Sequence, residues 1–187
     1  MLQRAPWTTL GAMLALLATN APAVGQDRSS VKIPDKRLVI ATAEGSGQLP
    51  LFVSPDWGRP RPEVIRVLII FHGDGRSAKS YFNSAKKSRR LAGEHGRGTL
   101  IVAPQFLAEG DLKNDPPDDA RMLLRWTTQT WKDGEPALGP APLSSFEVID
   151  AILARLADRT IFPNLAQAVV AGHSAGGQIV QIGRAHV

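Results

Sequence analysis

The segment that most constrains the fold is an almost continuous apolar run, VIRVLIIF, at Val64–Phe71. Many of its side chains are β-branched, which favours an extended strand. A strand with one solvated face alternates apolar and polar residues, whereas this run offers almost no polar face. The run is therefore typical of a strand that is covered on both faces, as in the parallel sheet of an α/β protein.

Other segments repeat this pattern and place helices between the strands. Ser144 and Glu147 match a capping box, which predicts that a helix begins there. Strands alternating with helices predict one α/β domain with a mostly parallel sheet flanked by helices. The expected elements are a hairpin of Arg37–Ala41 and Leu49–Val53, a helix over Lys79–Ala92, a strand at Thr99–Ala103, a helix after Ser144 and a strand at Ala168–Ala171.

The stretch from Gln105 to Pro142 breaks the pattern, because it is long, polar and without clear periodicity. A loop of this length in a compact domain is often functional, so a lid or one wall of a pocket is expected. Its two tryptophans either line such a pocket or pin the loop to the core. Its acidic residues match no calcium-binding spacing and are expected to be solvated. These residues are Trp126, Trp131, Asp111, Asp115, Asp118 and Asp119.

The strongest chemical motif is GHSAG at Gly172–Gly176, which fits the G-x-S-x-G pattern where a buried strand ends and a helix begins. A strand that turns directly into a helix would place Ser174 in a strained backbone conformation. Glycines two residues on either side remove the resulting clash. The sequence therefore predicts that the Ser174 hydroxyl is exposed above the sheet and that the Ala175 amide faces any oxyanion formed there.

A second motif, FHGDGR at Phe71–Arg76, directly follows the long apolar strand. An oxyanion hole needs a second backbone donor, and the Asp74 amide is the candidate. His72 lies at the strand end. It is expected to hold the loop by hydrogen bonding, with a role as general base as the less favoured alternative.

Together, FHGDGR and AGHSAGG resemble the oxyanion loop and nucleophile elbow of the α/β-hydrolase superfamily, in particular exported bacterial esterase-like hydrolases. The resemblance covers about Arg37 to Gln181. It implies a central, parallel nucleophile strand, acyl transfer through Ser174, no cofactor or metal, and a small-molecule or polymeric ester as substrate. A non-catalytic ligand-binding module with the same fold is the alternative.

Serine hydrolases of this superfamily order their triad as serine, acid and histidine along the chain. The segment Ala175–Val187 contains no acidic residue, and its only histidine is His186. The last six residues, IGRAHV at 182–187, are the translation of a common sequencing-library adapter, ATCGGAAGAGCACACGTC. The sequence therefore predicts that residues 26–181 are the N-terminal part of a hydrolase domain that ends just after the nucleophile elbow. This chain is expected to be poorly soluble and to lack turnover.

Residues 1–25 are predicted to be a signal peptide, because Arg4 precedes the short apolar run Leu10–Ala18 and small residues follow. This indicates a secreted or periplasmic protein without a stable membrane anchor. The basic residues between Arg76 and Arg97 are interpreted as a solvated helix face, so no nucleic-acid partner is expected. The absence of cysteine excludes disulfides and thiolate metal sites, and the four histidines show no metal-binding pattern.

Overall fold

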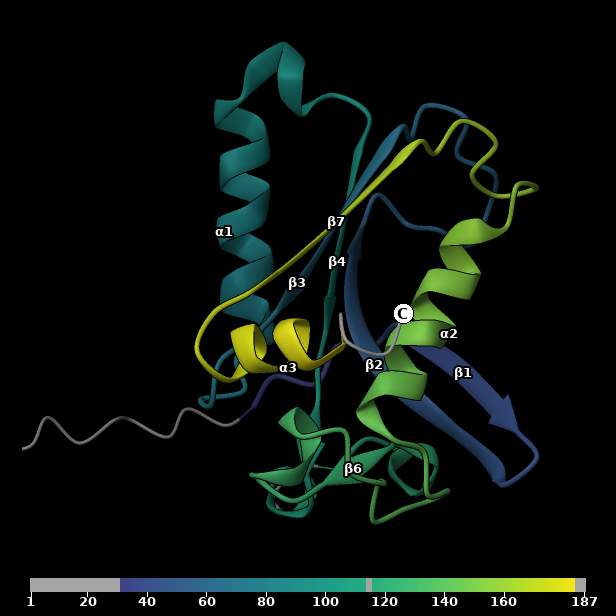
Figure 1. Ribbon diagram of the computed structural model, residues 1–187, viewed down its shortest axis with the longest axis vertical. Coiled ribbons are helices and arrows are strands. Elements are labelled where there is room, and N and C mark those ends of the chain that lie inside the picture. The colour runs from purple at the N-terminus through teal and green to yellow at the C-terminus, as the bar shows by residue number, and fades with distance from the viewer. Residues whose placement is uncertain (1–30, 114–115, 184–187) are drawn as a thin grey trace, which may run out of the picture.

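The computed structural model of the chain describes residues 31–113 and 116–183 (Figure 1). The predicted signal peptide and residues 184–187 lie outside the described residues, as does Asp115. Within the described part, no helix is long and apolar enough to cross a membrane.

A mixed five-stranded sheet forms the centre, with the order β1-β2-β4-β3-β7. The strands β3, β4 and β7 run parallel, whereas β1 and β2 form an antiparallel hairpin and β2 pairs antiparallel with β4. The expected α/β fold is confirmed, with a sheet that is half antiparallel in its pairings. The strand bounds are Arg37–Thr42 (β1), Gly45–Ser54 (β2), Arg66–Phe71 (β3), Thr99–Pro104 (β4) and Gln167–Gly172 (β7).

Helices cover both faces of the sheet, as the apolar strands require. Helix α1 (Ala78–Leu91) lies on one face and α2 (Ser145–Ala157) on the other (Figure 1). Each face of the sheet has its own hydrophobic cluster, and alternate residues of β3 pack into the two clusters. Val67, Ile69 and Phe71 pack on the α2 side, and Leu68 and Ile70 pack on the α1 side. This double coverage explains why the strand reads as a continuous apolar run.

Helix α2 begins as its sequence predicts. The Ser144 hydroxyl accepts a hydrogen bond from the Glu147 amide at 3.1 Å, and the Glu147 carboxylate accepts one from the Ser144 amide at 2.8 Å. This reciprocal pairing satisfies two backbone donors that a helix start leaves open.

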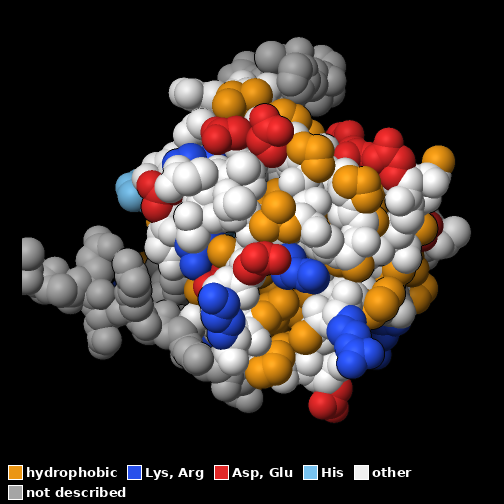
Figure 2. All heavy atoms as spheres, turned by 90° about the horizontal axis from the view of Figure 1, so that it is seen from below, with side chains coloured by type: hydrophobic (Ala, Val, Ile, Leu, Met, Phe, Trp, Pro, Cys, Tyr) orange, Lys and Arg blue, Asp and Glu red, His pale blue; other side chains and the backbone are white. Residues whose placement is uncertain are grey.

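The long segment after β4 contains only short elements. Two-residue strands, β5 (Leu107–Ala108) and β6 (Arg125–Trp126), pair in parallel. The 3₁₀ turns are η2 (Glu109–Leu112), η3 (Ala120–Met122) and η4 (Thr130–Lys132); η1 (Gly93–Gly96) follows α1. Figure 2 views the end of the molecule that carries β6, where acidic, basic and apolar side chains are interspersed.

The two tryptophans of this segment are fully buried in the α2-side core. The Phe106 ring lies 5.2 Å from the Trp126 ring and 5.3 Å from the Trp131 ring, measured between centroids. Of the two interpretations of these tryptophans, the structure therefore supports the one in which they pin the loop to the core.

Candidate active site

Ser174 lies at the turn between β7 and helix α3 (Ala175–Gly183), and its side chain is exposed. Its φ angle of +55° is in the left-handed region, which a non-glycine residue adopts only under strain. Among the described residues, Arg76 is the one other non-glycine residue with positive φ, at +48°, and it lies in the loop after β3. Both strained positions thus belong to the two motifs that the sequence singled out.

The glycines of the motif are required by close packing. A Cβ atom at Gly172 would overlap the Gly176 carbonyl. A Cβ atom at Gly176 would lie 2.5 Å from the His72 carbonyl oxygen and 2.6 Å from that of Phe71. The absence of side chains therefore lets the first turn of α3 pack directly against the end of β3.

The loop after β3 reaches the serine. A Cβ atom built on Gly73 would lie only 3.4 Å from the Ser174 Cβ. Within the described part of the chain, neither the Asp74 amide nor the Ala175 amide donates a hydrogen bond to a protein acceptor. Asp74 and Ala175 each follow one of these two residues in the chain, so both candidate amides are close in sequence to the point where the loop approaches the serine.

His72 fixes the peptide that carries the Asp74 amide. Its Nδ1 donates to the Gly73 carbonyl at 3.0 Å, and its Nε2 accepts from the Phe106 amide at 3.1 Å. The Gly73 carbonyl also accepts from the Arg76 amide at 2.9 Å. Because N–H and C=O point in opposite directions across a trans peptide, holding this carbonyl also sets the direction of the Asp74 N–H.

Burial lowers the pKa of His72 to about 4, while the hydrogen bond to Gly73 opposes that shift. The ring is therefore neutral near pH 7, and both of its nitrogens are occupied. This agrees with the expected role of holding the loop and leaves no lone pair for the alternative role as a general base.

Further contacts of the loop come from Gln105, which no sequence pattern singled out, and from Asp111. Buried Gln105 accepts from the Ala78 amide at 3.2 Å and donates to the Arg76 carbonyl at 2.8 Å. The Arg76 guanidinium binds both oxygens of Asp111, at 3.1 and 2.8 Å. The prediction that Asp111 is solvated is wrong, because its carboxylate pairs with Arg76 and also accepts from the Ala108 amide at 2.7 Å.

The turn η4 and the residue that follows it contact the loop after β3 and helix α3. Trp131 lies 4.6 Å from the His72 ring, measured between centroids. Lys132 Nζ lies 3.4 Å from Asp74 Oδ1, and Asp133 Oδ1 accepts from Gln178 Nε2 at 2.5 Å. The long segment therefore contacts the two elements next to Ser174 through adjacent charged residues, whereas its expected role as a lid or pocket wall stays a prediction.

A base for the serine is not visible among the described residues. Within them, the Ser174 hydroxyl has no hydrogen-bond partner. Of the described histidines, His72 is fully engaged, His95 is on η1, and His173 Nδ1 lies 3.1 Å from the Tyr81 hydroxyl. His186 lies outside the described residues.

In the part of the chain that the structure describes, no three His, Asp or Glu side chains are grouped so as to hold a metal ion. Asp119, one of the acidic residues of the long segment, instead pairs with Arg37 at 2.6 Å. That contact, mainly through its hydrogen bond, keeps the pKa of the Asp119 carboxyl below its ordinary value.

No protein-family model matches the chain, and no curated protein matches it. Solved structures do. Poly(aspartic acid) hydrolase-1 from Sphingomonas sp. KT-1 matches 81% of this chain and 51% of its own, with 22% identity and a TM-score of 0.48. The siderophore hydrolase EstA from Aspergillus nidulans matches 91% of this chain and 55% of its own, with 16% identity and a TM-score of 0.41.

The siderophore hydrolase EstB from the same fungus matches 86% of this chain and 52% of its own, with 20% identity and a TM-score of 0.39. The chain thus spans about half the length of these hydrolases. At these identities the likeness concerns the fold over that half, so the function has to be argued from the site itself.

Proposed function

We propose that the chain is part of a serine hydrolase of the α/β-hydrolase type that cleaves carboxylic esters through an acyl-enzyme on Ser174. The observation that carries this proposal is the exposed, left-handed Ser174 beside Gly73, at the junction of β7 and α3. A strained turn that presents a hydroxyl, together with two backbone amides that have no protein acceptor among the described residues, suits acyl transfer.

In the proposed reaction, Ser174 Oγ attacks the ester carbonyl carbon and its proton passes to a base. The carbonyl oxygen becomes an oxyanion that accepts hydrogen bonds from the Ala175 and Asp74 amides. Collapse of this intermediate breaks the bond to the alcohol, which leaves with the proton. Water then repeats the sequence on the acyl-enzyme and releases the acid.

The base and its orienting carboxylate are proposed to come from residues outside the described part, in the order serine, acid, histidine. No cofactor enters this scheme. The predicted signal peptide further leads us to propose that the reaction takes place in the periplasm or outside the cell. Both small and polymeric esters remain candidate substrates.

The test uses the complete protein encoded by the genomic locus. We expect it to be labelled by a fluorophosphonate probe and to hydrolyse a p-nitrophenyl ester. Ser174→Ala should abolish labelling and lower kcat by about four orders of magnitude or more. Ser84→Ala, which changes an exposed serine on α1, is the matched control and should leave both unchanged.

The alternative, a ligand-binding module without turnover, predicts a different result. The complete, folded protein would then bind an ester without cleaving it and would resist the fluorophosphonate. That outcome, or turnover that persists in Ser174→Ala, would overturn the proposed function.

A further inference from the structure

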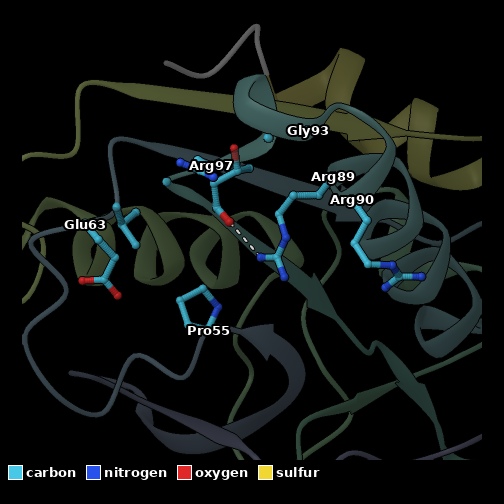
Figure 3. Close-up of a pocket in the computed structure, with 10 residues that line it drawn as sticks. Pro55, Glu63, Arg89, Arg90, Gly93 and Arg97 are labelled. Carbon is cyan, nitrogen blue, oxygen red and sulfur yellow. Dashed lines mark hydrogen bonds between the residues drawn. The ribbon is translucent and has the colours of Figure 1, made fainter.

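A cleft of about 320 Å³, whose lining residues are drawn in Figure 3, lies at the other end of the sheet from Ser174. It is formed where α1 ends, where η1 turns and where β4 begins at Thr99. Ser174 instead follows the carboxyl end of β7, which pairs in parallel with β3. The cleft is therefore separate from the candidate active site.

The cleft is rich in positive charge. Three arginines line it, Arg89, Arg90 and Arg97, against a single carboxylate, Glu63. The Glu63 carboxylate already lies 3.5 Å from the Arg61 guanidinium. Besides Arg89 and Arg90, helix α1 carries three further cationic side chains, Lys79, Lys86 and Lys87, and no acidic one, which adds to the positive field. A concave surface with one sign of charge concentrates counterions of the other sign.

Arg89 is the central cation of this lining. Its side chain extends into the middle of the residues drawn in Figure 3, whereas that of Arg90 points to one side. Arg89 Nη1 donates to the Ser54 and Thr99 carbonyls, at 2.9 Å each. Both acceptors are neutral, and among the described residues no carboxylate pairs with Arg89. A half-buried cation has lost part of its hydration, so a bound anion would stabilise it.

The arginines at the edge of the cleft are available for such an anion. Arg90 is exposed and pairs with no carboxylate among the described residues. Arg97 contacts Glu94 at 2.7 Å, but both side chains are more than 70% exposed, at 77% and 73%. A solvated pair of this kind contributes little, so Arg97 can exchange Glu94 for a ligand.

The end of α1 explains part of this arrangement, because cations are favoured where a helix ends. The same helix end repels anions, since its last carbonyls point outwards. Any anion in the cleft must therefore be held by the guanidinium groups. Their planar forks match phosphate oxygens and can bind them in pairs, and the volume is at the lower end of small-ligand sites.

We propose that this cleft binds a phosphate group through Arg89, Arg90 and Arg97. The group is either inorganic phosphate, or a phosphate ester of similar size, or the headgroup of an anionic phospholipid. This inference does not depend on the proposed hydrolase function.

The test is a titration of the chain with inorganic phosphate, followed by backbone and Arg side-chain NMR signals. Shifts are expected at the Arg89 Nε–H and at the Gly96 and Gly98 amides. The variant Arg90→Gln/Arg97→Gln should weaken binding about tenfold. The matched control, Lys79→Gln/Lys87→Gln, has the same change in charge at exposed positions of α1 outside the cleft, and should change the affinity by less than about twofold.

A second experiment distinguishes a phospholipid headgroup from a small phosphate-containing ligand. Co-sedimentation is measured with vesicles of phosphatidylcholine mixed with phosphatidylglycerol, and with phosphatidylcholine alone. Binding to the anionic vesicles that the cleft variant loses and the control keeps identifies a lipid headgroup. Shifts with phosphate but no vesicle binding identify a small ligand.

Two results would overturn the proposal. One is the absence of both shifts and vesicle binding at phosphate concentrations up to about 20 mM. The other is an equal loss in the cleft variant and the control, which would mean that the charge of α1 attracts anions without a specific site.

Discussion

Of the residues that the structure describes, two non-glycine residues carry backbone strain, and each is held by its surroundings. Ser174 is fixed by the packing of Gly172 and Gly176, and Arg76 by its two hydrogen bonds to Asp111. Strain of about 1 to 3 kcal/mol per residue persists only where neighbours over-determine the conformation. Both motifs are therefore built as rigid turns, which is what a preorganised oxyanion hole requires.

His72 gives this part of the molecule a specific pH dependence. Burial lowers its pKa from 6.5 in the unfolded chain to about 4 in the folded protein. The unfolded chain therefore binds a proton first as the pH falls. The contribution of His72 is fully present above pH 6.5 and is lost between 6.5 and 4, with a total on the order of 3 kcal/mol. Urea unfolding at about pH 7.5 and about pH 4.5 measures this loss.

The control for this prediction is His72→Gln, which lacks the titrating ring. It is expected to be less stable than the natural chain at neutral pH but to lose less stability on acidification. The pKa values of Asp56 and Asp119 are lowered from 3.8, so these carboxyls reduce stability only at more acidic pH. An unchanged pH profile in His72→Gln would assign the effect to another group.

The sequence was informative where a residue type is required by local geometry. Ser174 and its two glycines are adjacent in the chain and are needed at a strand-to-helix turn. Gln105 and Asp111 gave no such signal, because they reach the loop after β3 across 29 and 35 residues. A single carboxylate in a polar stretch is typical of a solvated loop, and only the fold brings Asp111 to Arg76.

Among the elements, η4 has the most direct influence on the candidate site. Its buried Trp131 packs on His72, and the next two residues each contact one of the two elements that carry the candidate site. Lys132 reaches the loop of Asp74, while Asp133 reaches α3 through Gln178. Residues 131–133 therefore brace the loop of Asp74 against helix α3.

Asp133→Ala tests this brace in the complete protein. Without the acceptor for Gln178, the first turns of α3 lose one tie, and a small displacement of the Ala175 amide weakens oxyanion binding. We expect kcat to fall about tenfold with KM within about twofold, since the interaction matters in the transition state. Asp133→Asn keeps an oxygen acceptor and should retain most of the activity. A change confined to KM would make η4 a substrate contact.

The elements themselves were largely predictable, and their partners were not. The apolar runs and the capping box gave β3, β4, β7 and the start of α2 to within about two residues, as expected for strong local patterns. The β5–β6 pair joins segments separated by the η2 and η3 turns, and its two-residue strands are too short for any periodicity to be visible. The path of the long segment therefore required the structure.

At the scale of the whole molecule, the sheet has two different ends and two different edges. The carboxyl ends of the parallel strands carry the candidate active site, and their amino ends carry the arginine cleft. Loops at the carboxyl ends of parallel strands commonly form binding sites in α/β proteins. The edges differ in charge: β1 contains Arg37, whereas β7 contains no charged residue.

The β7 edge leads to a prediction about association. Within the described residues, β7 pairs with β3 alone, and Val169 and Val170 are 37% and 38% exposed. An uncharged apolar edge strand can pair with another chain.

Light scattering after size exclusion should therefore show association of residues 26–187 that grows with concentration and is reduced by Val170→Lys. Val39→Lys makes the same change on β1, where Val39 is 66% exposed, and should leave association unchanged if β7 is the edge that pairs. If Val39→Lys were the more effective variant, association would occur through β1, and the exposed face of β7 would not limit solubility.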